Sequence, residues 1–135
     1  KGDEIIISSH TMLATASAIK FAGGTPIPVD IGEDNLISSE SIENAITSNT
    51  VGIMPTQLNG RVCEMDTISK IAKKNKLFVV EDSAQALGAR YKGQHAGTFG
   101  DIAALLMSAF TGLPFKNSDN SLSFLFREIS SSRST

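Results

Sequence analysis

Residues 77–89 of the chain read L-F-V-V-E-D-S-A-Q-A-L-G-A, and this stretch decides the fold. Its first four residues are a continuous apolar run without alternation, which is typical of a strand buried on both faces of a parallel sheet. We therefore expect a central strand here. Glu81 and Asp82 follow that run, and Asp82 falls at the edge of the sheet where open α/β folds bind their ligands. The stretch thus predicts both an α/β fold and the place of its functional site.

Around this strand, short apolar runs alternate with helix-like stretches over residues 2–100, which is typical of βαβ units. We expect a mostly parallel sheet with flanking helices. Pro26 and Pro28 lack the backbone N–H that a sheet ladder needs. The strand over residues 25–30 should therefore be irregular or lie at an edge of the sheet.

The spacing of apolar residues and the capping residues predict the other elements. Ser38 or Ser39 should cap a short helix through Ile46, with Glu40 in its first turn. Asp66 should cap a later helix that ends near Asn75. The remaining expectations are a strand over residues 5–7, a helix over residues 11–22 with Met12, Ala16, Ile19 and Ala22 on its inner face and a stop at Gly23-Gly24, a strand over residues 51–54, and inward-facing Ile68, Ile71 and Ala72 in the later helix.

Length and composition restrict the class of protein. The 135 residues correspond to one domain or part of one, and 41% hydrophobic residues suffice for a core. Twelve Lys and Arg against 14 Asp and Glu give 12 − 14 = −2, so no net positive field attracts nucleic acid or an acidic membrane. The single Cys63 favours a cytoplasmic protein, because no internal disulfide can form. We also expect no membrane span and no metal site.

Two interpretations of Asp82 stay open on local grounds. A carboxylate at a strand end is costly to bury unless a cation or a hydrogen-bond donor faces it, so Asp82 can be a functional group that meets a ligand. It can equally be a helix N-cap whose oxygens accept backbone N–H groups.

Several strings then occur in an informative order and spacing. They are G-D-E-I-I-I-S-S-H-T over residues 2–11, A-I-K-F-A-G-G-T-P-I-P-V-D over residues 18–30, I-M-P-T-Q-L-N-G-R-V-C-E-M-D over residues 53–66, V-V-E-D-S-A-Q-A-L-G-A over residues 79–89, and Y-K-G-Q-H-A-G-T-F-G-D-I-A over residues 91–103. Together they resemble the DegT/StrS-type sugar aminotransferases, which use pyridoxal phosphate. The resemblance implies a large domain of fold type I, with residues 1–104 as the central part of its cofactor-binding domain.

The resemblance also implies roles for individual residues. Asp82 would pair with the pyridine nitrogen of the cofactor and keep it protonated, so that the ring can accept electrons. Gln85 would lie near the phenolic oxygen, where its amide can donate a hydrogen bond. Met12 takes the position of an aromatic residue that stacks on the ring in many members, and His10 lies beside the site as an acid–base candidate. His95, in a glycine-flanked turn, is expected at the surface.

The reaction of this family needs a lysine that forms a Schiff base and then carries a proton. The family places it about ten residues after the Gly-Asp pair, here Gly100-Asp101, but that count leads to Thr111. Lys116, in a Pro-x-Lys-Asn setting, is the remaining candidate and comes five residues late. No Gly-Asp-Gly-Gly stretch follows it.

The ends of the chain carry further expectations. The family's phosphate-binding turn would precede residue 2, and the chain opens at Lys1 rather than Met, so we expect a fragment that is inactive on its own. Residues 117–135 contain seven serines, and we expect residues 105–135 to be a divergent, poorly ordered tail. A change of reading frame or a faulty gene boundary after about Ala104 would account for it.

Three functions from different classes remain. The first is amino transfer from an amino acid, with glutamate as the expected donor, to a nucleotide-linked keto-sugar, in a parent enzyme that forms a homodimer. The second is a non-catalytic α/β binding or dimerisation module derived from the same scaffold, which the missing lysine favours. The third, a flavodoxin-like or phosphoacceptor module with Glu81 and Asp82 as an acidic pair, lacks the further strand-end residues of such a site.

Overall fold

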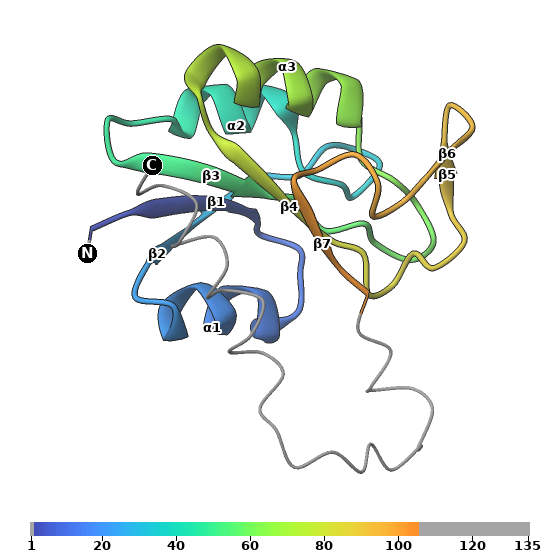
Figure 1. Ribbon diagram of the computed structural model, residues 1–135, viewed down its shortest axis with the longest axis horizontal. Helices are drawn as coiled ribbons and strands as arrows, with labels where there is room; N and C mark the ends of the chain where they lie inside the picture. The colour runs from blue at the N-terminus through green and yellow to red at the C-terminus, as the bar shows by residue number, and fades with distance from the viewer. Residues whose placement is uncertain (1, 106–135) are drawn as a thin grey trace, which may run out of the picture.

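The computed structural model describes residues 2–105, and within them strands and helices alternate as expected (Figure 1). The elements in chain order are β1 (Glu4–Ser8), α1 (Leu13–Phe21), β2 (Thr25–Val29), α2 (Ser39–Ala45), β3 (Thr50–Met54), α3 (Met65–Asn75), β4 (Phe78–Asp82), β5 (Arg90–Tyr91), β6 (Gln94–His95) and β7 (Ile102–Ala104). The predicted α/β fold is confirmed.

One parallel sheet organises the described residues, with the strand order β2-β1-β3-β4-β7. The proline-containing strand β2 lies at an edge, as its missing donors predict. Strand β4 pairs with β3 on one side and β7 on the other, so the apolar run does form an interior strand. Between β4 and β7, the antiparallel pair β5-β6 forms a small separate hairpin.

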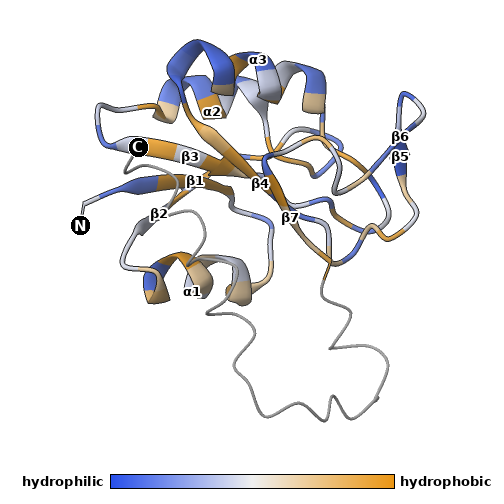
Figure 2. Ribbon diagram, viewed as in Figure 1, coloured by the Kyte–Doolittle hydropathy of each residue, from blue (hydrophilic) through white to orange (hydrophobic). Residues whose placement is uncertain are grey.

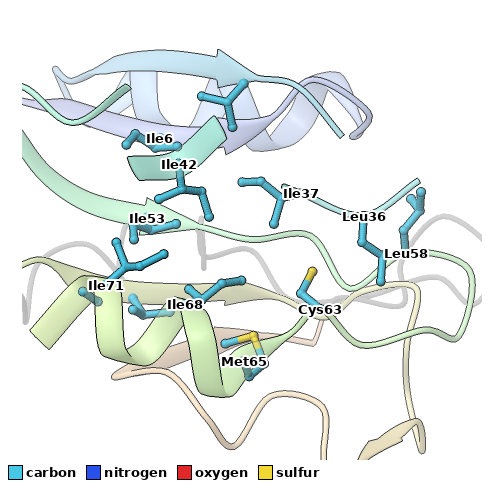
Figure 3. Close-up of a cluster of buried hydrophobic side chains, with 13 residues drawn as sticks. Ile6, Leu36, Ile37, Ile42, Ile53, Leu58, Cys63, Met65, Ile68 and Ile71 are labelled. Carbon is cyan, nitrogen blue, oxygen red and sulfur yellow. The ribbon is translucent and has the colours of Figure 1, made fainter. Parts of the chain in front are cut away.

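Helices cover both faces of the sheet, with α1 on one side and α2 and α3 on the other (Figure 1). Successive residues of β4 therefore enter different cores: Val79 joins the larger cluster under α2 and α3, and Val80 joins the smaller cluster under α1. Figure 3 shows the larger cluster, in which Ile6 and Ile53 of the sheet lie near Ile42, Ile68 and Ile71 of the helices. In Figure 2 the strands of the sheet are mostly hydrophobic, while α3 alternates between hydrophilic and hydrophobic residues.

The predicted limits and inner face of α1 need correction. Met12 has an extended backbone (φ −73°, ψ 147°) and is the N-cap, so the helix begins at Leu13. Its side chain is 57% exposed and does not enter the core, and Ala22 is an exposed C-cap. Ile19 is buried and Ala16 packs against the same cluster, as predicted. Gly23, with φ 89°, ends the helix.

The capping predictions for the other two helices have different outcomes. Ser38 Oγ accepts a hydrogen bond from the Ser41 N–H at 3.3 Å, which confirms the cap of α2. The predicted Asp66 cap of α3 is wrong, because the helix begins at Met65 and its N-cap is Glu64, two residues before Asp66. Asp66 lies in the first turn, and its carboxylate forms an ion pair with Lys92 instead. The inward-facing residues of α3 are as predicted: Ile68, Ile71 and Ala72 are buried.

Within residues 2–105, none of the helices has the length and apolarity that crossing a bilayer requires.

Candidate active site

The carboxyl ends of three neighbouring strands bring the candidate residues to one edge of the sheet. Strand β1 ends at Ser8, β3 at Met54 and β4 at Asp82. The pairing continues beyond β3, because the Gln57 N–H donates to the Asp82 carbonyl at 2.8 Å and the Asp82 N–H donates to the Pro55 carbonyl at 2.9 Å. The segments after β1, β3 and β4 therefore share this edge.

Asp82 is half-buried, and its two carboxylate oxygens have different surroundings. Oδ2 accepts a short hydrogen bond from the Thr15 hydroxyl at 2.6 Å. Oδ1 accepts only a long one, 3.4 Å from the Ala84 N–H, among the hydrogen bonds of residues 2–105. Residues 83–89 form turns and no helix, so the interpretation of Asp82 as a helix N-cap is wrong. One oxygen is held in place, and the other keeps capacity for a further donor.

The residues after β1 lie at the same edge, with side chains open to solvent. His10 is exposed, and its backbone N–H and C=O both bond to Ser8 Oγ at 3.2 Å. Met12 is exposed as well, as described above. An exposed thioether at this edge is free to lie against an aromatic ring.

Gln85 lies in the turn after β4, and it is half-buried. Its backbone carbonyl accepts from the Gly60 N–H at 2.9 Å, which fixes the turn against the segment after β3. Its side-chain amide makes no hydrogen bond within the described part of the chain. His95 is exposed on β6, as predicted. Lys116 and the predicted tail lie outside the described residues, apart from exposed Leu105.

Sequence reasoning missed the most heavily hydrogen-bonded group of the site, the carboxylate of Glu81. It is 0% exposed. Oε1 accepts from the backbone N–H groups of Phe99 at 2.6 Å and Gly100 at 2.8 Å. Oε2 accepts from the Gly97 N–H and from the Gln57 side-chain amide, both at 2.8 Å. Four N–H donors thus satisfy a buried charge.

The sequence contained a signal for this arrangement. Side chains alternate between the faces of a strand, so Glu81 and Asp82 have to point in opposite directions. Two consecutive acids at the end of a buried strand therefore cannot serve one site. The donors themselves are 16 to 24 residues away in the chain.

The G-T-F-G-D string of residues 97–101 has a structural explanation. A Cβ on Gly100 would lie 2.7 Å from the Val79 carbonyl oxygen, so only glycine fits there. Asp101 Oδ2 accepts from the Val79 N–H at 2.8 Å, and the Asp101 N–H donates to the Val79 carbonyl at 2.8 Å. The string holds the turn before β7 against β4.

Gln57 extends the same network to the segment after β3. Its Oε1 accepts from the Cys63 N–H at 2.7 Å. The Cys63 thiol is fully buried, and it donates to the Thr56 carbonyl at 3.3 Å. Burial raises the pKa of Cys63 from 9.0 to about 12. The thiol is therefore a protonated structural group.

The raised pKa of Cys63 makes stability depend on pH in the alkaline range. The unfolded thiol loses its proton near pH 9 and the folded one only near pH 12, so the free energy of unfolding should fall between these values. The slope for this group is about 1.4 kcal/mol per pH unit. Urea unfolding at pH 8 and above, for wild type and Cys63→Ser, measures it. As pH rises, the free energy of unfolding of wild type should fall relative to that of Cys63→Ser. A difference that stays constant with pH would contradict the raised pKa of Cys63.

The Glu81 network predicts a large cost for a small change. Glu81→Gln replaces one acceptor oxygen by an NH₂ group that must face N–H donors, so the free energy of unfolding should fall by about 2 kcal/mol or more. Hydrogen exchange at the N–H groups of Gly97, Phe99 and Gly100 should become faster. The exposed Glu33→Gln is the matched control and should change neither quantity. Equal stability of the two variants would show that the buried carboxylate does not hold this turn.

Comparison with known proteins gives the family. The model of the DegT/DnrJ/EryC1/StrS aminotransferase family matches residues 1–110. GDP-perosamine synthase of Escherichia coli O157:H7 is 45% identical over 104 residues, which are 76% of this chain and 29% of that protein. The dTDP-3-amino-3,4,6-trideoxy-alpha-D-glucose transaminase of Streptomyces venezuelae is 39% identical over 117 residues, 86% of this chain and 30% of that protein.

A solved structure agrees with these relatives. Spr1654 from Streptococcus pneumoniae, in its PLP form, superposes with a TM-score of 0.71 at 35% identity and covers 76% of this chain and 30% of that one. This chain therefore spans less than a third of the length of the relatives that it matches. The match over residues 1–110 is well over half of the chain, and the chain belongs to the DegT/DnrJ/EryC1/StrS aminotransferase family.

Proposed function

We propose that the enzyme to which this chain contributes transfers an amino group from an amino acid to the keto group of a nucleotide-linked sugar, with pyridoxal phosphate as cofactor. Glutamate is the proposed donor. Residues 1–104 are the central part of the cofactor-binding domain in this proposal. The names of the relatives support the sugar acceptor, since one of them is a transaminase whose name contains a dTDP-linked amino sugar.

The observation that carries the proposal is the geometry of Asp82. Its carboxylate lies at the carboxyl end of β4, the edge at which open α/β sheets bind ligands. Oδ2 is held by Thr15, and Oδ1 has only the long contact with Ala84. This arrangement fits an N–H donor such as the protonated pyridine nitrogen, because Oδ1 can accept a charge-assisted hydrogen bond from it.

When bound, pyridoxal phosphate supplies a conjugated ring that accepts the electron pair of the breaking substrate Cα–H bond. The part of this chain is to keep that ring electron-poor: the Asp82 carboxylate holds a proton on the ring nitrogen. The Gln85 amide would donate to the phenolic oxygen, and the Met12 thioether would lie against the ring face. His10 is an acid–base candidate beside the site.

The identity of the lysine that would hold the cofactor is the part of the proposal that depends on sequence alone. Lys116 is the proposed residue, on the grounds of its Pro-x-Lys-Asn setting. Lys116 would hold the cofactor through its side-chain amine, and the same amine would carry the proton to and from the substrate.

A homodimer in the cytoplasm is the proposed setting of the full-length enzyme. In this proposal Leu13 and Phe21 of α1, which are 81% and 92% exposed, lie on a surface that the rest of the full-length enzyme or its partner subunit covers. A single buried thiol at Cys63 suits a reducing compartment.

Asp82→Asn separates a cofactor role from a structural one. The two side chains are nearly isosteric, so the melting temperature of a full-length enzyme with this domain should change by only a few degrees. Turnover with glutamate and a keto-sugar nucleotide, measured as release of 2-oxoglutarate, should fall about 100-fold or more. The reason is that the substitution removes the carboxylate charge that holds the proton on the ring nitrogen. Asp30→Asn, an exposed position after β2, is the control and should retain full turnover. If Asp82→Asn unfolds the domain while the remaining folded fraction turns over normally, Asp82 is structural and the proposal fails.

A further inference from the structure

Three threonine hydroxyls form a continuous chain of hydrogen bonds that ends on Asp82. The Thr15 hydroxyl contacts Asp82 Oδ2 at 2.6 Å and the Thr11 hydroxyl at 2.9 Å. The Thr11 hydroxyl contacts the Thr56 hydroxyl at 2.8 Å. The members come from the loop after β1, the first turn of α1 and the segment after β3. Segments distant in sequence thus converge on one carboxylate oxygen.

The chain has one direction. A carboxylate only accepts hydrogen bonds, so the Thr15 hydroxyl uses its single hydrogen to donate a hydrogen bond to Asp82. Thr15 must then accept from Thr11, and Thr11 in turn must accept from Thr56. Each hydroxyl polarises the next one, and all three dipoles point their positive ends toward Asp82.

Burial makes this chain difficult to replace by water. Thr15 is 5% exposed and Thr56 is 3% exposed. In such surroundings a hydrogen bond to a charged group is stronger than at the surface. The backbone of Asp82 is fixed as well, by its two bonds to the segment after β3, so Thr15 determines the remaining freedom, which is rotation of the carboxylate.

We propose that Thr15, supported by Thr11 and Thr56, is a positioning residue: it holds Oδ2 of Asp82 so that Oδ1 faces the ring nitrogen of the cofactor. This inference rests on the proposed function of Asp82. A purely structural role of Thr15, which would only join α1 to the sheet, predicts a loss of stability but no change in what the site recognises.

The test compares two ligands on a full-length enzyme that contains this domain, by equilibrium titration. One ligand is pyridoxamine 5′-phosphate, and the other is its analogue with C–H in place of the ring nitrogen. Wild type should prefer the nitrogen ligand, because only its ring donates to Asp82. Thr15→Val should lower that preference about tenfold and leave binding of the carbon analogue unchanged.

Two further variants complete the test. Thr15→Ser keeps the hydroxyl and should keep the preference. Thr47→Val removes a hydroxyl that donates to the Glu4 carboxylate near the amino end of β1, and it should also keep the preference. If Thr15→Val no longer binds the carbon analogue, Thr11→Val takes its place with the expectation of a reduced preference.

The outcomes separate this inference from the proposed function. A preference in wild type that survives in Thr15→Val, or in Thr11→Val where that variant is used, overturns the positioning role and leaves the role of Asp82 intact. A wild-type full-length enzyme that binds both ligands equally, or neither of them, contradicts the cofactor role of Asp82, and the inference falls with it.

Discussion

The buried carboxylate of Glu81 is the group on which the rest of the site depends. A charge with no exposed surface is stable only when its hydrogen-bonding capacity is filled, and here one amide and three backbone N–H groups fill it. Satisfying the charge therefore joins the end of β4 to the turn before β7 and to the segment after β3. The segment after β3 also holds the backbone of Asp82, through the N–H of Gln57 and the carbonyl of Pro55.

Strand geometry then gives two neighbouring acids different tasks. Glu81 points into the protein and is saturated with donors, whereas Asp82 points the other way, toward the hydroxyl of Thr15 in α1. Only Asp82 retains an oxygen with a single long contact among the described residues. Rigidity on one side of β4 and spare hydrogen-bonding capacity on the other are what a site for a protonated ring nitrogen requires.

The sequence predicted the features that depend on local pattern. The apolar run before Asp82 predicted an interior parallel strand, and Pro26 and Pro28 predicted an edge strand, because both signals follow from backbone hydrogen bonding. The Asp66 cap was wrong because the helix begins at Met65. Asp66 therefore lies in the first turn, and its carboxylate pairs with Lys92, 26 residues later. Met12 fits a helical apolar period but has an extended backbone.

Family resemblance pointed to Asp82 and Gln85, and the structure places both at the carboxyl edge of the sheet. Their cofactor roles remain predictions, and the sequence did not predict their hydrogen-bond partners. Thr15 and Glu81 were missed because their hydrogen-bond partners are distant in the chain. Thr15 and Asp82 are 67 residues apart, and the donors to Glu81 are up to 24 residues away, which no local pattern encodes. Lys116 remains a prediction.

The most direct measurement of the central claim is the protonation state of the cofactor ring on this protein. Pyridoxamine 5′-phosphate labelled with ¹⁵N in the ring reports that state through its nitrogen chemical shift. Bound to the wild-type full-length enzyme, the nitrogen should stay protonated at a pH where the free cofactor has lost that proton, because the Asp82 carboxylate stabilises the charge. An identical titration for bound and free cofactor would contradict the account.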